Sequence, residues 1–293
     1  MTKSIEDYNE ILLREEPLSR HTWLRLGGPA QYFLTPRSEG ELLSVIQSCR
    51  EQGLPIYVLG AGSNLLVREE GVRGAVIRVM ETLLSDVHID GTSVTAGGGA
   101  LLSHVISEAV RAGLGGVEHL VGIPGTIAGA VVGNSGGRAG DIGQLVTSVE
   151  VLTQDGERAV RQGDELSFSY RRSSIQDLLI LSVTLKLTKD DSEELTRRMR
   201  KNWIIKRSTQ PLADQSAGCI FRNPRGLSAG ALIEQSGLKG MSVGKARISE
   251  RHANFIVTES GATSRDIEQL IGRIQKAVAE KFAVNLDLEI KVW

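Results

Sequence analysis

The chain has 293 residues, of which 41% are hydrophobic and 24% are charged, and its formal net charge is −1. A chain of this length is expected to form two or three domains, and its composition excludes a fibrous or largely disordered protein. The near-neutral charge gives no electrostatic reason to expect nucleic-acid or anionic-membrane binding. The N-terminus is polar and no apolar stretch is long enough to span a bilayer, so we expect a cytoplasmic protein.

Cysteine and histidine spacing excludes several kinds of site. Cys49 and Cys219 are far apart and show no CxxC pattern, which indicates neither a disulfide framework nor a cysteine-rich zinc site. The histidines show no HExxH spacing, so we predict no metal site. The G-x-S-x-G elbow of many hydrolases is also missing. What stands out is glycine, 33 of 293 residues, concentrated between Gly60 and Gly143.

The N-terminal half is predicted to alternate short strands with helices. Residues 22–28 and 31–34 predict two strands around a glycine turn. Residues 38–52 predict a helix, because Ser38 can cap its start and Gly53 can end it. A second helix is expected at residues 101–112. Further strands are predicted at residues 55–59, 65–67, 75–79 and 93–96.

The C-terminal half continues this mixture, which predicts an α+β fold. Strands are expected at residues 148–153, 179–181, 183–187 and 254–258, and helices at 192–206, 229–236 and 264–282. The helix at 192–206 is rich in arginine and lysine, which usually means a solvated face, with a phosphate-facing role as the alternative. Residues 286–293 alternate apolar and polar side chains, which predicts a strand that joins a sheet made elsewhere.

The segment from Gly60 to Asn64 follows a predicted strand and has the sequence Gly-Ala-Gly-Ser-Asn. A Rossmann fingerprint is disfavoured, because the third glycine is missing and another strand follows instead of a helix. Two interpretations stay open. The backbone N–H groups of a tight glycine turn can bind an anion, and the segment can equally be a plain turn between two strands.

Two further glycine segments follow. Residues 97–99 lead into a helix, and Gly125, Gly129 and Gly133 are spaced four apart, as on one face of a helix. Glycine inside a helix costs about 1 kcal/mol relative to alanine, so such a face indicates a close helix crossing or a ligand. Without the GK[ST] ending of a P-loop, the three segments favour an extended diphosphate-containing cofactor over a nucleoside triphosphate.

Several segments in a fixed order make the sequence resemble one family. These are residues 55–67, 121–137, 170–173, 217–224 and the terminal strand with Glu289. Together they resemble the UDP-N-acetylenolpyruvoylglucosamine reductase (MurB) family from about Thr22 to the C-terminus. The resemblance implies a non-covalently bound FAD, NADPH as co-substrate and reduction of the enolpyruvyl ether of UDP-N-acetylglucosamine to UDP-N-acetylmuramate for peptidoglycan synthesis.

The resemblance also implies a fold and a domain order. The fold is the FAD-binding fold of the vanillyl-alcohol-oxidase (PCMH) type with a separate C-terminal α+β substrate-binding domain. We expect the first FAD-binding subdomain at residues 1–60, joined by the terminal strand 284–293, the second at 61–190 and the substrate-binding domain at 191–283. Residues 224–252 contain no tyrosine, which matches the shorter class of the family that lacks a substrate-capping tyrosine loop. We expect a monomer.

Three residues match the family's catalytic positions. Arg171 would stabilise the enolate that develops on hydride transfer, and Cys219 would donate the proton, at a position where many members carry serine. A thiol has a far lower pKa than a hydroxyl, so this replacement should ease proton delivery. Glu289 would orient the substrate. Without the resemblance, Cys219 would be interpreted as core and the other two as surface residues.

The remaining expected contacts also follow from the resemblance. The cofactor is expected to contact Gly60, Gly62, Ser63, Asn64, Gly98, Gly122, Pro124, Gly125, Thr126, Gly129, Ala130, Asn134 and Gly136, and the substrate Tyr170, Arg222 and Asn223. The main alternative is an FAD-dependent oxidase of an alcohol or sugar with the same fold, with His88, His104 or His119 available to attach FAD covalently. A non-catalytic nucleotide-binding module is a second alternative.

Overall fold

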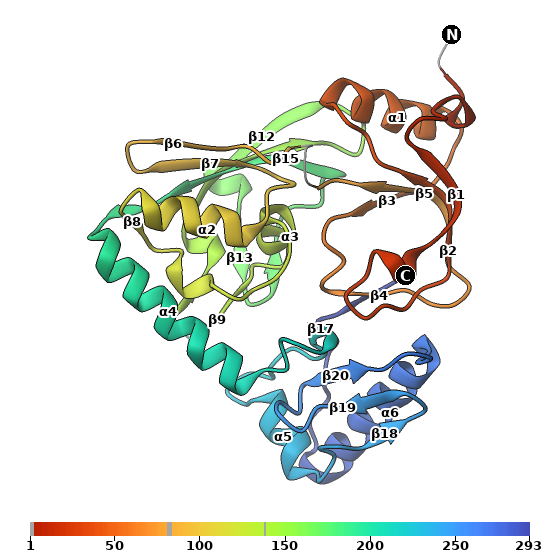
Figure 1. The fold of residues 1–293 in the computed structure, drawn as a ribbon, viewed down its shortest axis with the longest axis vertical. Coiled ribbons are helices and arrows are strands. Elements are labelled where there is room, and N and C mark those ends of the chain that lie inside the picture. The colour runs from red at the N-terminus through yellow and green to blue at the C-terminus, as the bar shows by residue number, and fades with distance from the viewer. Residues whose placement is uncertain (1–2, 81–83, 138) are drawn as a thin grey trace. The chain divides into compact units, whose positions relative to one another are not determined.

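The computed structural model describes residues 3–80, 84–137 and 139–293. The chain divides into two compact units that alternate along the sequence (Figure 1). Unit 1 comprises Met1–Arg14, Tyr32–Ala61 and Gly74–Ile205, and unit 2 comprises Glu15–Gln31, Gly62–Arg73 and Lys206–Trp293. Segments 15–31 and 62–73, which the sequence prediction assigned to FAD-binding subdomains, therefore group with the C-terminal part. The three-domain division stays a prediction.

A four-stranded sheet and one helix form the first part of the fold. The strand order is β1(Leu12–Pro17), β2(Pro29–Leu34), β5(Val72–Arg78) and β3(Ile56–Leu59), and β3 and β5 are parallel. Helix α1(Glu39–Glu51) begins as predicted, because Ser38 Oγ accepts a hydrogen bond from Glu41 N at 3.2 Å. Its apolar face packs on the sheet, and burial there raises the pKa of the Cys49 thiol to about 11.

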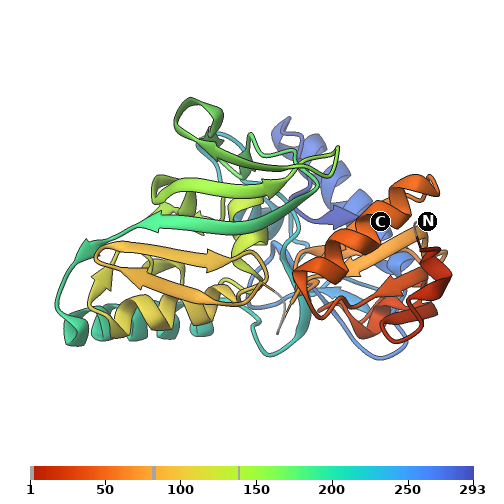
Figure 2. The ribbon, with the colours of Figure 1, turned by 90° about the horizontal axis from the view of Figure 1, so that it is seen from above.

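A five-stranded antiparallel sheet forms the rest of unit 1 (Figure 2). Its strand order is β12(Arg158–Gln162), β11(Val146–Leu152), β15(Leu179–Lys186), β7(Ser93–Gly97) and β6(Val87–Asp90). Helices α2(Leu102–Arg111) and α3(Ile127–Val132) contribute side chains to the same core as this sheet. The two strands predicted at 179–187 are one continuous strand, which adapts to β11 through a register shift rather than a break.

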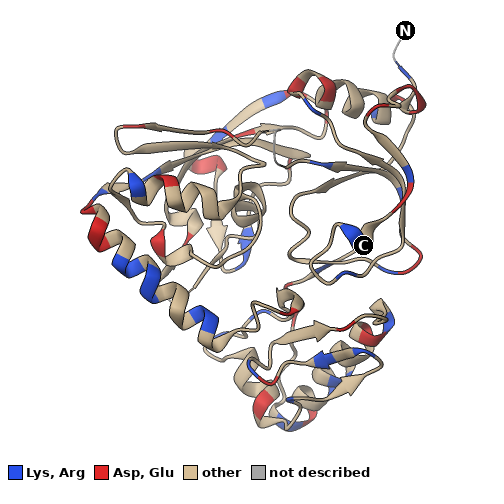
Figure 3. Ribbon diagram, in the orientation of Figure 1, with Lys and Arg blue, Asp and Glu red and all other residues tan. Residues whose placement is uncertain are grey.

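Short elements connect the strands and helices of unit 1. The paired ones are β8(Leu114–Gly115) with β16(Thr188–Lys189), β9(Gly136–Gly137) with β10(Gly140–Asp141), and β13(Phe168–Ser169) with β14(Arg172–Ser173). The short 3₁₀ helices are η1(Ile5–Asp7), η3(Glu118–Leu120), η4(Ile142–Gln144) and η5(Gly163–Glu165). Helix α4(Ser192–Thr209) confirms the predicted charged helix and carries Lys and Arg along its length (Figure 3).

A four-stranded antiparallel sheet with two helices forms the centre of unit 2. The strand order is β17(Gln215–Cys219), β20(Phe255–Thr258), β19(Ala246–Ile248) and β18(Ser242–Val243). Helices α5(Ala229–Gln235) and α6(Ser264–Phe282) pack against it in one apolar core. The alternating residues of the terminal segment join this core, and β21(Lys291–Val292) pairs in parallel with β4(Leu65–Leu66). The prediction had joined this strand to the first FAD-binding subdomain.

One predicted strand is wrong. Residues 22–28 form a turn after η2(Leu18–Arg20), in which Arg25 N donates to the carbonyl of Thr22 at 3.2 Å. Arg25 adopts a φ of +55°, which is incompatible with an extended strand. The alternating leucines produced the strand pattern, but Leu24 and Leu26 are buried because the turn folds both of them into the core of unit 2.

In the described residues, no helix combines the length and low charge that a membrane span requires. Within the same residues, no group of three or more metal-ligating side chains comes together.

The capping box of α6 predicts a measurable contribution to stability. Thr263 Oγ1 accepts from Asp266 N at 3.2 Å, and the Asp266 carboxylate accepts from Thr263 N at 3.0 Å. We expect Thr263→Ala to lower the free energy of unfolding by about 1 kcal/mol. Thr263→Ser keeps the oxygen and should stay close to wild type in urea unfolding. An equal loss in both variants would contradict a capping role.

The half-buried His252 predicts a pH dependence of stability. Burial, and secondarily the charge of Lys239, lower the pKa of its imidazole, while the Glu234 carboxylate opposes the shift. Because the unfolded chain keeps the ordinary higher pKa, it binds the proton first as the pH falls, so stability is lost below about pH 6.5. His252→Asn should flatten the dependence of unfolding free energy between about pH 7 and 5. An unchanged pH dependence in His252→Asn would contradict this role for the imidazole.

Candidate active site

The turn from Gly60 to Asn64 leaves almost no room for side chains at its glycines. In unit 1, a Cβ on Gly60 would lie 3.0 Å from Thr126 Oγ1, so the first and third glycine segments are neighbours. In unit 2, Gly62 has a φ of +64° and its Cβ would lie 2.1 Å from the carbonyl oxygen of His21. Glycine is therefore required at Gly62 by conformation and by contact.

Asn64 has a structural role within unit 2. Its side-chain Nδ2 donates to the carbonyl of Glu289 at 3.2 Å, and its own carbonyl accepts from Lys291 N at 3.1 Å. Asn64 was predicted as a cofactor contact. The structure shows that it also holds the terminal segment that carries Glu289.

The second glycine segment is packed tightly inside unit 1. Gly98 N donates to the carbonyl of Leu181 at 2.8 Å, and a Cβ on Gly98 would lie 2.1 Å from the carbonyl oxygen of Ile180. The carbonyl of Gly98 accepts from Ala128 N at 3.2 Å. The protein's own backbone thus explains the glycine at this position.

The predicted face of three glycines on one helix is wrong. Helix α3 is six residues long, so Gly125 precedes it, with a φ of +113°, and Gly133 forms its C-cap. Thr126 caps the helix by accepting from Gly129 N at 3.3 Å. A Cβ on Gly129 would have only an ordinary contact of 3.6 Å with Thr126 within the described part of unit 1. A close helix crossing therefore does not explain Gly129 there, which leaves the ligand interpretation.

Arg171 lies at the tip of a hairpin. Strands β13 and β14 pair Ser169 with Arg172, so Tyr170 and Arg171 form the connecting turn, and Arg171 has a φ of +57°. A positive φ is strained for an arginine and is typical of functional turns. The guanidinium donates to the carbonyl of Gly136 at 3.0 Å and to that of Asn134 at 3.4 Å. These bonds hold it beside the third glycine segment.

The side chain of Asn134 links this hairpin to the loop at Gly143. Its side chain is buried, donates to the carbonyl of Ser169 at 2.9 Å and accepts from Gly143 N at 2.9 Å. A Cβ on Gly143 would collide with Phe168 at 2.4 Å, so these elements pack without spare volume. Asn134, predicted as a cofactor contact, thus has its side-chain amide engaged by the protein.

Cys219 is half-buried at the end of β17, where the strand pairing shifts by one residue. Ser216 faces Val257 and Cys219 faces Phe255, so the ladder advances three residues on β17 and two on β20. The extra residue is accommodated by Gly218, which has a φ of +76°. This bulge turns the chain after Cys219 away from β20.

Glu289 lies on the segment next to Cys219. Its N–H donates to the carbonyl of Ile220 at 2.8 Å, and Arg222 N donates to the carbonyl of Asp287 at 2.9 Å. Unit 2 therefore brings together two predicted catalytic residues that are far apart in sequence, while the third, Arg171, belongs to unit 1.

The predicted substrate residues of unit 2 continue this segment. Asn223 Oδ1 accepts from Ala229 N at 2.9 Å, at the start of α5. Nε of Arg222 is shielded from solvent and has no hydrogen-bond partner among the described residues. A buried guanidinium nitrogen without an acceptor is unusual and is consistent with a site for an anionic ligand.

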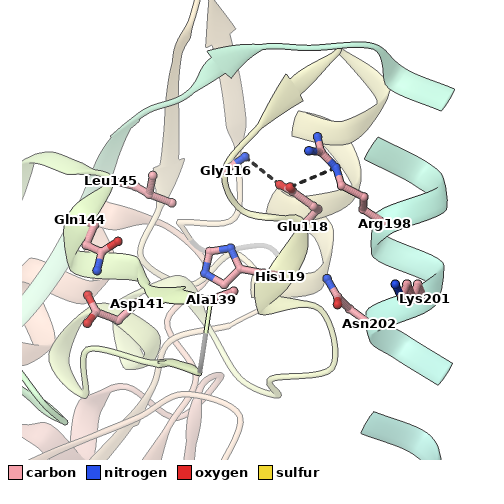
Figure 4. Close-up of a pocket in the computed structure, with 10 residues that line it drawn as sticks. All are labelled: Gly116, Glu118, His119, Ala139, Asp141, Gln144, Leu145, Arg198, Lys201 and Asn202. Atoms are coloured by element: carbon pink, nitrogen blue, oxygen red, sulfur yellow. Dashed lines mark hydrogen bonds and ion pairs between the residues drawn. The ribbon is translucent and has the colours of Figure 1, made fainter. Parts of the chain in front are cut away.

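A cavity lined by side chains lies elsewhere in unit 1. Its volume is about 520 Å³, and Figure 4 shows that Glu118 lies between Gly116 and Arg198 on one wall. Gly116 N donates to the Glu118 carboxylate at 2.7 Å, and Arg198 lies 3.6 Å from it. None of the predicted catalytic residues lines this cavity.

The candidate site contains residues that the sequence did not indicate as functional. Gly218 shapes the bulge, and the buried Asn254 contacts the backbone of Phe221. The available signal for Asn254 was a polar residue at the start of a strand whose other side chains are mainly apolar. Such a residue needs a hydrogen-bonding partner when buried.

Comparisons with known proteins agree with this arrangement. Residues 30–160 match the FAD binding domain family, and residues 210–293 match the C-terminal domain of UDP-N-acetylenolpyruvoylglucosamine reductase. These matches confirm the predicted fold class, an FAD-binding part followed by a separate C-terminal part.

Similar full-length proteins carry the same name. A UDP-N-acetylenolpyruvoylglucosamine reductase of Moorella thermoacetica is 45% identical over 96% of this chain and 93% of its own. One of Heliobacterium modesticaldum is 41% identical over 100% and 94%. The crystal structure of the Thermus caldophilus enzyme, MurB, superposes with a TM-score of 0.83 at 39% identity and covers 96% of this chain and 99% of that one. The chain therefore belongs to the UDP-N-acetylenolpyruvoylglucosamine reductase (MurB) family.

Proposed function

We propose that this protein reduces UDP-N-acetylglucosamine enolpyruvate to UDP-N-acetylmuramate in peptidoglycan precursor synthesis, with FAD as cofactor and NADPH as electron donor. The observation that carries the proposal is the placement of Cys219 and Glu289 on adjacent, hydrogen-bonded segments of a chain whose near full-length relatives bear this activity as their name. We expect a cytoplasmic monomer.

The glycine segments fit a bound dinucleotide cofactor. Gly62 has the left-handed φ of +64° that tight anion-binding turns use, and Gly129 is open at the side where a Cβ would stand. Gly60, Ser63, Gly122, Pro124, Gly125, Thr126, Ala130 and Gly136 would complete the non-covalent contacts. When bound and reduced, the flavin supplies the hydride that the enol ether accepts at C3.

Arg171 would stabilise the charge that develops during this transfer. Hydride addition to an enol ether conjugated with a carboxylate builds negative charge on C2 and on the carboxylate oxygens. The guanidinium is anchored by the carbonyls of Gly136 and Asn134, so it is fixed before the reaction. Prior fixation matters, because a group that must first reorganise stabilises the transition state less.

Cys219 would supply the proton to C2, and Glu289 would orient the substrate. The thiol loses its proton as the new C–H bond forms, and the resulting thiolate recovers a proton from solvent after product leaves. A thiol is a stronger acid than the hydroxyl of serine, so the cysteine can perform this step at neutral pH. Tyr170, Arg222 and Asn223 would contact the substrate, with the guanidinium of Arg222 suited to its anionic groups.

Separate measurement of the two half-reactions tests the proposal. NADPH should bleach the flavin under anaerobic conditions, and the enol ether should then restore its absorbance. Cys219→Ala should leave the bleaching step intact and slow the second step by about 100-fold or more, because only that step needs the proton. Cys219→Ser should retain substantial turnover, since a hydroxyl can replace the thiol. As a control, Cys49→Ala should leave both steps unchanged.

Other outcomes would point elsewhere. Equal loss of both steps in Cys219→Ala would remove the proton-donor role. Failure of the wild-type flavin to be reoxidised by the enol ether, with fast reoxidation by oxygen and an alcohol or sugar as reductant, would favour the oxidase alternative. Flavin that stays attached to acid-precipitated protein would do the same.

Thiol labelling should distinguish the two cysteines. Cys49 is completely buried with a pKa raised to about 11, whereas Cys219 is half-buried at the end of a strand. Since the thiolate is the reactive form, iodoacetamide should label Cys219 selectively at neutral pH, and UDP-N-acetylmuramate should slow the labelling. Mass spectrometry locates the label. Preferential labelling of Cys49 would contradict this assignment of environments.

A further inference from the structure

Asn254 is a buried side chain to which the reaction assigns no chemical role. It lies directly before β20 and is 3% exposed. Its Oδ1 accepts from Phe221 N at 3.0 Å, and its Nδ2 donates to the carbonyl of Phe221 at 2.8 Å. Its own carbonyl accepts from Ile220 N at 2.9 Å. Asn254 therefore holds three consecutive backbone groups of the segment that follows Cys219.

The position of Asn254 explains why a side chain is needed here. The pairing of β17 with β20 ends at Cys219 and Phe255, after the bulge at Gly218. Beyond this point no further β20 residue faces Phe221 in the ladder. The amide of Asn254 directs its oxygen and one of its two N–H donors at the N–H and carbonyl of Phe221, so it continues the pairing as a peptide group would.

The other edge of the same segment holds Glu289. The carbonyl of Ile220 accepts from Glu289 N at 2.8 Å, and Phe221 forms an isolated antiparallel bridge with Leu288. Residues 219–222 thus lie between Asn254 on one side and the segment 287–290 on the other. A displacement of Phe221 would move Cys219 and Glu289 together.

The backbone of Asn254 is itself fixed. Its N–H donates to Nδ1 of His252 at 3.2 Å, and the His252 ring packs edge-on against Phe255 with centroids 4.9 Å apart. Each of the four polar atoms of Asn254, N, O, Oδ1 and Nδ2, therefore has a protein partner. A residue whose polar groups are satisfied in this way acts on the reaction through the segment it holds and not by contact with a ligand.

We propose that Asn254 is a positioning residue that sets the placement of Cys219 and Glu289 for proton delivery to the substrate. The proposal rests on the proposed function, in which Cys219 is the acid. Displacement of a reacting group by about 1 Å can slow a reaction about 100-fold. Proton delivery should therefore suffer when Asn254 is changed, while flavin reduction by NADPH, which does not use Cys219, should not.

The test compares two variants of Asn254 with a matched control on the same strand. Asn254→Asp keeps an acceptor for Phe221 N but loses the donor to its carbonyl, and Asn254→Ser shortens the side chain. The control is Thr258→Val, which removes the buried hydrogen bond from Thr258 Oγ1 to the carbonyl of Leu24 at 2.9 Å without touching residues 219–222. Melting temperature and FAD content are measured for each variant.

The expected result is a split between the half-reactions. In the FAD-loaded Asn254 variants, bleaching by NADPH should stay within about twofold of wild type, while reoxidation by the enol ether slows about 10- to 100-fold. Thr258→Val should change neither step beyond about twofold, even if its melting temperature falls as much as those of the Asn254 variants. If both steps decline in proportion to melting temperature in all three variants, Asn254 is only structural and the proposal fails.

A second measurement does not depend on the reaction. The rate at which iodoacetamide labels Cys219, recorded against pH, should change in both Asn254 variants and stay at the wild-type profile in Thr258→Val. A wild-type enzyme that is inert towards the enol ether would overturn the proposed function, and the labelling profiles would still decide whether Asn254 places Cys219. Unchanged labelling and unchanged reoxidation in both variants would overturn the positioning role. If neither Asn254 variant accumulates as folded protein while Thr258→Val does, the residue is structural and the proposal likewise fails.

Discussion

The hydrogen bond between Ile220 and Glu289 is the constraint on which the C-terminal unit depends. It joins the segment that follows β17 to the last residues of the chain. The side chain of Asn64 also binds Glu289, by donating a hydrogen bond to the Glu289 carbonyl. Three separated stretches of sequence are thereby fixed at one place. The first bond joins two backbone groups and the second joins the Asn64 amide to a backbone carbonyl, so chain geometry and side chains together maintain the arrangement.

In unit 1, the hairpin that carries Arg171 restricts this side chain before any ligand binds. An arginine is long and has many rotamers, so a free side chain would lose considerable entropy on binding an anion. Here the left-handed turn at Arg171 and the carbonyls of Asn134 and Gly136 restrict it in advance. Asn134 has a positive φ as well, a conformation that asparagine adopts more readily than most residues.

The sequence predicted local elements well where a single physical rule applied. Helix α1 follows from the Ser38 cap and Gly53, and the terminal alternation correctly identified the side chains that join the core. Predictions from residue spacing were wrong where a residue with a positive φ breaks the expected element. Arg25 interrupts the predicted strand at 22–28, and Gly125 lies before the short helix α3 instead of inside it. The strand β1(Leu12–Pro17) was missed because three consecutive residues in it, Arg14, Glu15 and Glu16, are charged and interrupt the apolar pattern. Asn254 was missed because its importance arises only from pairing with a segment far away in sequence.

The two cysteines show how placement decides chemistry. Cys49 lies on the inner face of α1, where burial raises its pKa and leaves the thiol inert. Cys219 has the same side chain at a point where a strand leaves its sheet, so its backbone is held firmly while its side chain is only partly covered. Sequence spacing gives no reason to separate them, because a lone cysteine beside apolar residues suggests core in both cases. The bulge at Gly218 separates them, because it turns the chain out of the β17–β20 ladder and towards Glu289.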